Sequence, residues 1–276
     1  MAVTTITPYE NMSTVLKQNL GWLKSFSPQA SRILTSAMNA CRVRPKLLEC
    51  APQSMLTALI QCAQYDIEPD SPLQQCHLIP YGKEVKLIIG YRGLIALAYR
   101  NTLIDMIEAN VVRQGDEFEY RHTQDGTILN HTENLEVDRT DHTLIKAVYT
   151  MIFLRGSTKA LVRAMTKDQV DAIMRRSPAY QRDKQSPWTT DYDSMAIKTV
   201  LKNAIKYVPL SVEQGDRLAS AVSHDNDTEG GKKSASEAEA AAIVKEAADA
   251  GQLNLEIDAA ATTEELRDEE ELRHEG

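Results

Sequence analysis

The chain of 276 residues carries a formal net charge of −8 at pH 7, and 42% of its residues are hydrophobic. These values are typical of a globular protein with one large domain, or with a domain and appendages. The sequence has no run of about 18 apolar residues, so no membrane-spanning helix is expected. The first residues, MAVTTITPYENM, lack the basic start and apolar core of a secretory signal, and we expect a cytoplasmic protein.

The negative charge is concentrated near the C-terminus. Residues 223–276 contain 16 acidic and 5 basic side chains, a net of −11, whereas residues 146–206 contain 12 basic and 5 acidic ones, a net of +7. A basic body with an acidic tail is typical of a DNA-binding protein. It is equally typical of a solvated surface followed by a disordered tail, so charge alone does not decide the function.

The hydrophobic periodicity predicts helices in the first part of the chain, followed by a hairpin and a further helix. Pro69 and Pro72 end the third helix, and Tyr81-Gly82 marks the turn of the hairpin. The expected elements are helices at residues 11–26, 28–41 and 52–65, strands at 76–79 and 85–89, and a helix that begins at Tyr91.

The middle of the chain changes to strand patterns, which we expect to form one compact antiparallel sheet. The expected strands lie at residues 104–112, 117–121, 127–131, 144–154 and 159–164. Thr166 and Gln169 then form the capping-box pattern that begins a helix. After it we expect a polar loop at 177–188, a helix from Asp191 that ends at Pro209, and a last helix at 212–222.

We therefore predict an α+β fold, in which a small antiparallel sheet packs with several helices. Residues 1–27 are expected to form an N-terminal arm and helix, and residues 28–223 the core. Residues 224–276 are interpreted as a flexible linker and a disordered acidic tail. The N-terminal helix has two open interpretations, because it can pack on its own core or on a neighbouring subunit.

Basic residues concentrate in three places. Lys198, Lys202 and Lys206 follow i, i+4, i+8 spacing and so share one helix face, opposite an apolar face. This pattern suits contact with successive phosphates, but a solvated helix face has the same pattern. The other basic residues of interest lie upstream of this helix and around the hairpin: Arg175, Arg176, Arg182 and Lys184, and Lys83, Lys86 and Arg92.

Aromatic side chains are few, with 3 Phe, 2 Trp and 10 Tyr. Tyr81, Tyr91 and Trp188 lie among the basic segments and are candidates for stacking on bases, although core packing explains each of them as well. The low number favours binding through the phosphate backbone.

An enzyme is the main alternative. Asp70, Glu84 and Lys86 match the PD…ExK spacing of many magnesium-dependent nucleases, in which two carboxylates hold the metal and the lysine assists the attacking water. This short pattern also recurs by chance. The sequence has no GxxxxGK[ST] phosphate loop and no CxxC pair among its four cysteines, so we expect neither ATP hydrolysis nor a protein metal site.

Five blocks of sequence, in this order, resemble the RecT family of phage-type single-strand DNA annealing proteins. They are EPD at 68–70, LIPYGKEVKLIIGYRGLIALAYR at 78–100, VVRQGDEFEY at 111–120, MTKDQVDAIMRRS at 165–177 and PWTTDYDSMAIKTVLKNAIKYVPLS at 187–211. The resemblance implies a bent antiparallel sheet against helices. It also implies ATP-independent binding and annealing of single strands for homologous recombination and DNA repair, without covalent catalysis, and magnesium only as a counterion.

The resemblance further implies a homo-oligomer, as a ring or a helical filament on the annealed duplex, which works with a partner exonuclease and the host single-stranded-DNA-binding protein. A protein that only coats single strands remains a second alternative. With the resemblance, the residues expected to contact DNA are Lys83, Lys86, Arg92, Arg175, Arg176, Arg182, Lys184, Lys198, Lys202 and Lys206.

Overall fold

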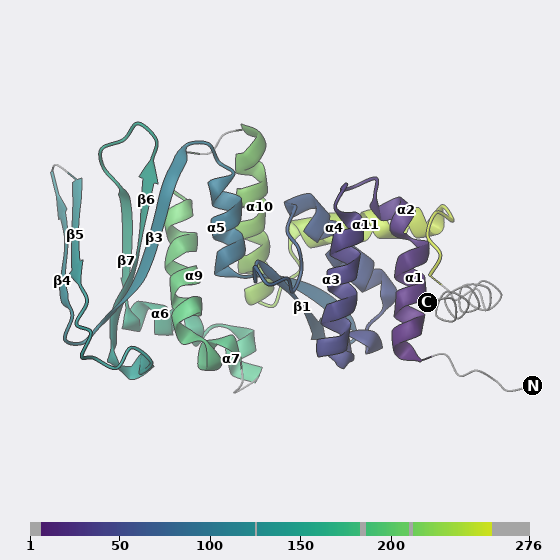
Figure 1. The fold of residues 1–276 in the computed structure, drawn as a ribbon, viewed down its shortest axis with the longest axis horizontal. Helices are drawn as coiled ribbons and strands as arrows, with labels where there is room; N and C mark the ends of the chain where they lie inside the picture. The colour runs from purple at the N-terminus through teal and green to yellow at the C-terminus, as the bar shows by residue number, and fades with distance from the viewer. Residues whose placement is uncertain (1–6, 125, 183–185, 210–211, 256–276) are drawn as a thin grey trace, which may run out of the picture. The chain divides into compact units, whose positions relative to one another are not determined.

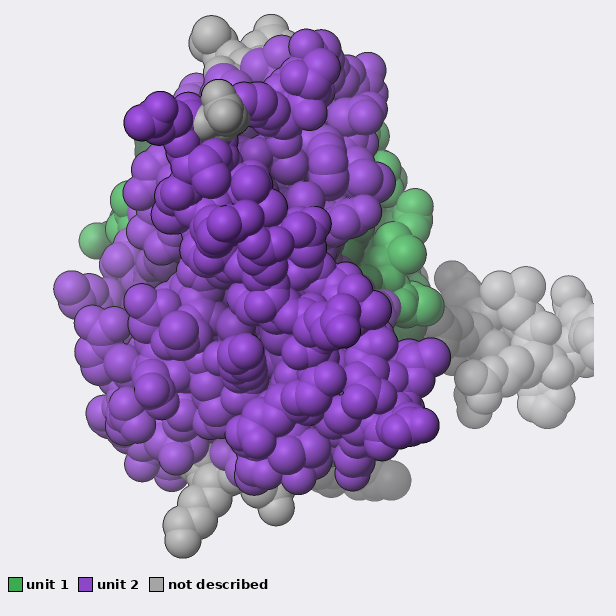
Figure 2. Space-filling view, turned by 90° about the vertical axis from the view of Figure 1, so that its left-hand side faces the viewer, with its two compact units in different colours: residues 1–88, 235–276 green, residues 89–234 purple. Residues whose placement is uncertain are grey.

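The computed structural model describes residues 7–124, 126–182, 186–209 and 212–255. Helices and small antiparallel sheets alternate along these ranges, which confirms the predicted α+β class (Figure 1). Within them, no helix is long and apolar enough to cross a bilayer. The chain divides into two compact units, which Figure 2 colours separately: unit 1 is residues 1–88 and 235–276, and unit 2 is residues 89–234. The expected boundaries at 27/28 and 223/224 do not coincide with this division.

Unit 1 is built mainly of helices. Its elements are α1 (Pro8–Gln18), α2 (Leu20–Leu23), α3 (Ala30–Val43), the 3-10 helix η1 (Pro45–Glu49), α4 (Pro52–Tyr65), the antiparallel strands β1 (Cys76–Tyr81) and β2 (Glu84–Ile89), and α11 (Ala235–Asp249). A capping box of Thr7 and Glu10 begins α1. Val15 and Leu16 of α1 are fully buried, and α1 packs on α3 and α4. The N-terminal helix therefore belongs to the core of its own unit.

Helix α11 returns the chain to unit 1, where it packs on α4. Ala240, Val244 and Ala247 are buried at a spacing of four and three residues, as on one face of a helix. The hydroxyl of Tyr65 donates a hydrogen bond of 2.7 Å to Ser236 Oγ. The prediction of a flexible linker is thus wrong for the described part of the C-terminal region. The acidic end, residues 256–276, lies outside the described residues.

Unit 2 contains a three-stranded antiparallel sheet in the order β3-β6-β7. Its strands are β3 (Ile104–Arg113), β6 (Ile145–Leu154) and β7 (Leu161–Thr166), and a separate hairpin consists of β4 (Glu117–Thr123) and β5 (Gly126–Thr132). The single five-strand sheet that we expected is therefore wrong. Phe118 and Leu129 of the hairpin pack against Ala147 and Tyr149, on one face of the sheet. Figure 2 views unit 2 from the side of this hairpin.

Helices cover the opposite face of the sheet (Figure 1). Unit 2 contains α5 (Tyr91–Tyr99), η2 (His142–Leu144), α6 (Lys167–Met174), α7 (Pro178–Arg182), α8 (Pro187–Thr190), α9 (Tyr192–Ile205) and α10 (Val212–Glu229). Ala196 and Val200 of α9 pack on Val111 and Val148. Neighbouring residues of a strand point to opposite faces, so the sheet is buried between α9 and the hairpin.

The predicted start of α6 is confirmed, whereas the loop predicted after it is wrong. Thr166 and Gln169 form the predicted capping box, in which the Thr166 hydroxyl oxygen accepts a hydrogen bond from the Gln169 N–H. The expected loop at 177–188 instead contains the short helices α7 and α8, each of which begins at a proline.

Replacement of Val244 by Asp is expected to destabilise unit 1 by more than about 2 kcal/mol, because it buries an unpaired carboxylate between α11 and α4. The matched change Ala242→Asp, on the exposed face of α11, is expected to alter stability by less than about 0.5 kcal/mol. Urea unfolding followed by circular dichroism measures both. Equal effects of the two changes would mean that α11 does not pack on α4.

Candidate nucleic-acid interface

The lysines of α9 do not form the exposed stripe that their spacing predicted. Lys198 is 3% exposed and Lys202 is 6% exposed. The Lys198 ammonium lies 2.7 Å from an oxygen of Asp225 and 2.8 Å from one of Glu229, and the Lys202 ammonium lies 2.9 Å from Asp225. Lys202 also pairs with Glu229. We call these four side chains the ion cluster.

The carboxylates of the ion cluster come from the last turns of α10, which is longer than the sequence predicted. The sequence predicted an end at Val222, but α10 continues to Glu229 and so carries Asp225 and Glu229 over the lysines. Two ammonium groups and two carboxylates balance in charge, which is the condition under which charged groups tolerate burial. Lys198 and Lys202 are thus structural in this unit, and of the three lysines only Lys206 is exposed.

The pKa values of the cluster follow from this balance. Burial alone would lower the pKa of Lys198, but the charges of Asp225 and Glu229 outweigh burial and raise it above 10.5. Burial alone would raise the pKa of Asp225, but Lys198 and Lys202 lower it below 3.8. Both groups are therefore charged at neutral pH.

The hairpin of unit 1 presents less free positive charge than expected. The side chain of Lys86 is only 14% exposed and pairs with Glu84 and Glu237. Lys83 is exposed, with its ammonium 3.8 Å from a carboxylate oxygen of Glu49. Of these two lysines, Lys83 alone fits an exposed contact with DNA.

The three candidate stacking aromatics differ in exposure. Trp188 is 3% exposed and packs against Tyr192 in the core between α9 and the sheet, so an open base platform at Trp188 is wrong. Tyr81 and Tyr91 are half-buried. The Tyr91 hydroxyl accepts a hydrogen bond of 3.3 Å from Nε of the exposed Arg92.

Exposed arginines gather at one end of unit 2. Arg175 and Arg176 follow α6, and Arg182 lies in the last turn of α7. We call these three residues the arginine cluster. Lys184, expected to lie with them, falls outside the described residues.

One further basic residue, in the turn after α10, lies near the arginine cluster. The turn after α10 packs beside α7. A Cβ atom placed on Gly231 of this turn would lie 3.2 Å from Pro178 and 3.7 Å from the Arg182 guanidinium. This turn holds the exposed Lys232, which the interpretation of this segment as a flexible linker had overlooked. Arg92 lies near Asp191, whose charge contributes, after the Tyr91 hydroxyl, to a raised pKa of Arg92.

The expected DNA-binding residues of unit 2 therefore divide between the two ends of α9. Asp191 precedes α9, and Lys206 directly follows it. The 14 residues of α9 rise about 1.5 Å each, which separates the two ends by roughly 20 Å. A strand that contacts both ends would have to run along unit 2 over several nucleotides.

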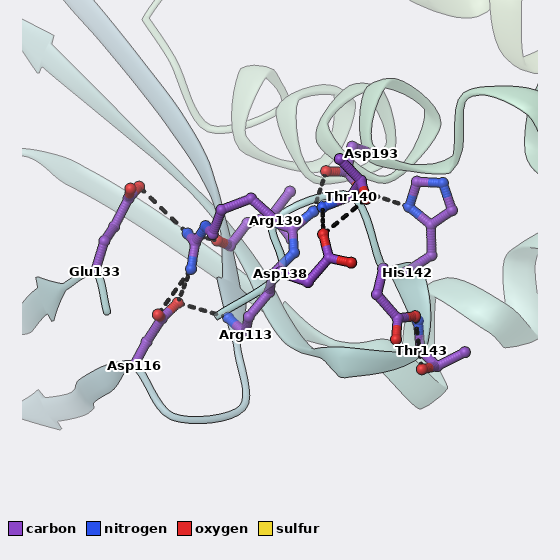
Figure 3. A network of polar contacts seen from close by, with 11 residues as sticks. Arg113, Asp116, Glu133, Asp138, Arg139, Thr140, His142, Thr143 and Asp193 are labelled. Carbon is purple, nitrogen blue, oxygen red and sulfur yellow. Dashed lines mark hydrogen bonds and ion pairs between the residues drawn. The ribbon is translucent and has the colours of Figure 1, made fainter. Parts of the chain in front are cut away.

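A network of buried polar groups occupies the block VVRQGDEFEY (Figure 3). The side chain of Asp116 is fully buried and accepts hydrogen bonds from the backbone N–H of Arg113 (2.7 Å), from Asn134 N–H (2.9 Å) and from Arg139 Nη1 (2.7 Å). It also contacts the His131 ring at 3.1 Å. Burial alone would raise the pKa of Asp116, but these donors lower it far below its ordinary value.

The same network connects the sheet to α9. Arg113 donates a hydrogen bond of 2.6 Å to Asp193 in the first turn of α9, and the His142 ring lies 3.0 Å from the other oxygen of Asp193 (Figure 3). The side chain of Arg113 is 4% exposed, which leaves no surface for a phosphate. The network therefore holds the loop at 133–143 on the sheet and is a structural feature of this block.

The residues of the nuclease alternative take part in ion pairs and hydrogen bonds within unit 1. Asp70 accepts a hydrogen bond from the Leu78 N–H (3.0 Å), contacts the His77 ring (2.9 Å) and pairs with Arg44. Lys86 pairs with Glu84 and Glu237. Among the described residues, no three His, Cys, Asp or Glu side chains form a group that would hold a metal ion. Asp70 and Lys86 therefore take part in separate sets of ion pairs.

A group of exposed arginines at one end of an α+β unit is one feature of nucleic-acid-binding proteins. The comparisons with known proteins agree. The model of the RecT family matches residues 31–243. Protein RecT of Escherichia coli strain K12 is 35% identical over 193 residues, which is 67% of this chain and 68% of that protein. Uncharacterized protein YqaK of Bacillus subtilis strain 168 is 26% identical over 190 residues, which is 67% of this chain and 62% of that protein.

The chain belongs to the RecT family. It is accordingly a recombination protein of the single-strand annealing class, as the five sequence blocks indicated.

Replacement of Asp225 by Asn is expected to destabilise unit 2 by about 3–5 kcal/mol, because it leaves two buried ammonium groups with Glu229 as the one remaining carboxylate of the ion cluster. The contribution of Asp225 is present above its unfolded pKa near 3.8 and is lost as the pH falls through its lower folded pKa. The wild type should therefore lose stability more steeply than the variant below about pH 4. Urea unfolding at several pH values measures this, with Asp216→Asn on the exposed face of α10 as control. Parallel acid profiles of Asp225→Asn and the wild type would contradict it.

Replacement of Asp116 by Ala is expected to destabilise the region around the loop at 133–143 by about 2–4 kcal/mol, because Arg139 and two backbone N–H groups lose their acceptor. Faster amide hydrogen exchange in this loop and in β4 measures the effect. Asp138→Ala, in the same loop but exposed, is the control and should leave the exchange of β4 unchanged. Unchanged exchange in Asp116→Ala would show that the network does not hold the loop.

Proposed function

We propose that this protein binds the phosphate backbone of single-stranded DNA and promotes the pairing of complementary strands without ATP. The observation that supports this most directly is the RecT-family match, which covers both the arginine cluster and α9. The exposed cations that fit phosphate contact are Lys83, Arg92, Arg175, Arg176, Arg182, Lys206 and Lys232. Lys86, Lys198 and Lys202 have carboxylate partners and are not assigned to DNA.

Arginine suits this task because its guanidinium binds phosphate oxygens through two parallel hydrogen bonds. Each phosphate that is neutralised releases condensed counterions, which favours binding regardless of base sequence. Contacts with the backbone leave the base edges free to meet a second strand. Correct pairing then supplies the free energy of annealing, so no nucleotide hydrolysis is required.

We infer that several subunits bind one strand side by side in a ring or filament, because a single unit 2 spans only a few nucleotides. We also infer that the protein acts in the cytoplasm beside an exonuclease that produces single strands and beside the host single-stranded-DNA-binding protein. Magnesium serves as a counterion to phosphate, and no step requires a catalytic residue.

Replacement of the arginine cluster by alanine (Arg175→Ala, Arg176→Ala and Arg182→Ala together) is expected to slow annealing of two labelled complementary oligonucleotides at least about tenfold. Three lost phosphate contacts should also reduce the slope of log K against log[salt] by about 2, at about 0.7 per contact. Annealing kinetics and equilibrium binding at several salt concentrations measure both effects.

The control carries Arg121→Ala and Arg155→Ala, which remove exposed arginines from the hairpin and from the end of β6. It should retain wild-type annealing within about twofold. If the arginine-cluster variant anneals strands like the wild type, the assigned surface is wrong. If the wild type slows pairing or shortens the strands, the protein is respectively a coating protein or a nuclease.

A further inference from the structure

We propose that Tyr207 and Arg163 form a stacking platform for one unpaired nucleobase of the bound strand. The proposal rests on the proposed function, because it adds a base contact to the backbone contacts described above. Neither residue was among those that the sequence assigned to DNA.

The geometry of the pair points to a platform. Tyr207 is 58% exposed. The Arg163 guanidinium carbon lies 4.0 Å from the centre of this ring, at the distance of a cation–π contact. One face of the ring is therefore backed by a cation, while the exposed remainder is open to a planar partner. Bases stack on aromatic and guanidinium planes in this way in single-strand-binding proteins.

The structure holds the ring in a defined position. The Tyr207 N–H donates a hydrogen bond of 3.0 Å to the carbonyl of Ala204, which continues the end of α9. Two residues later, the carbonyl of Pro209 accepts a hydrogen bond of 3.0 Å from the side-chain amide of Asn101, which is fully buried. Arg163 lies within β7, where it pairs in register with Thr150 of β6. A platform whose turn is held by these hydrogen bonds and whose arginine lies in a strand loses little entropy when a base stacks on it.

The surroundings fit a nucleic acid strand. Lys206, next to Tyr207, is exposed and can contact a phosphate of the nucleotide whose base is stacked. Core packing does not explain Tyr207, because more than half of its surface is exposed. A stacked base also remains competent for annealing, since stacking uses the face of the base whereas pairing uses its edge. One platform per subunit would hold one base in place and leave the others free.

The test compares binding of full-length protein to oligothymidine and to an oligonucleotide of equal length in which abasic sites replace the bases. Tyr207→Ala is expected to weaken binding to oligothymidine about 5- to 150-fold, the equivalent of one stacked base, and to leave binding to the abasic strand within about twofold. Tyr207→Phe keeps the ring and should bind both strands like the wild type. Tyr99→Ala, which removes another exposed tyrosine of unit 2 at the end of α5, is the matched control and should bind both strands like the wild type.

A second measurement needs no variant. Irradiation of wild-type protein bound to an oligonucleotide with 5-iodouracil should crosslink Tyr207, identified by mass spectrometry of the peptide. Equal loss of affinity for both strands in Tyr207→Ala, or no loss for either, would overturn the platform, as would crosslinks only at other residues. If the wild type binds neither strand, the proposed function fails as well. Loss of affinity that is confined to oligothymidine, together with a crosslink at Tyr207, establishes the platform.

Discussion

The ion cluster between α9 and α10 is the interaction on which the architecture of unit 2 depends. Removal of Lys198 and Lys202 from water is unfavourable unless each ammonium finds carboxylates at hydrogen-bonding distance. Asp225 and Glu229 supply them, and they do so only if α10 extends to its observed end at Glu229. The requirement for pairing thus fixes how α10 lies on α9, which in turn covers one face of the sheet.

This arrangement explains how the charges of unit 2 are divided. The lysines on the covered face of α9 are neutralised internally, and the exposed residues that we assign to DNA around α9 are arginines near its beginning and Lys206 at its end. The turn after α10 packs on α7 and so places Lys232 near Arg182. The core and the basic surface therefore use different cations: buried lysines that are paired with carboxylates, and exposed arginines on neighbouring segments.

Regular elements with strong local signals were predictable from the sequence. The helix at residues 52–65 and the capping box of Thr166 and Gln169 are confirmed, because proline, capping residues and apolar periodicity act locally. The burial of Lys198 could not be predicted from its spacing. Spacing of i, i+4, i+8 shows which residues share a helix face, but it does not show whether another helix covers that face. The end of α10 and the whole of α11 were missed because Gly230-Gly231 and a small-residue composition resemble a linker, whereas Ala240 and Val244 lie in a helix that packs on α4. The role of Arg113 was hidden for the same reason, because its partner Asp193 lies 80 residues away.

The central claim is that the lysines of the ion cluster are structural and that the exposed arginines bind the strand. Chemical footprinting of the full-length protein tests it most directly, with an acylating reagent for lysine and a dicarbonyl reagent for arginine, with and without a single-stranded oligonucleotide. We predict that Lys198 and Lys202 stay unmodified in both states, while Arg175, Arg176 and Arg182 react in the free protein and are protected by DNA. Modification of Lys198 or Lys202 in the free protein, followed by protection on DNA binding, would contradict the account.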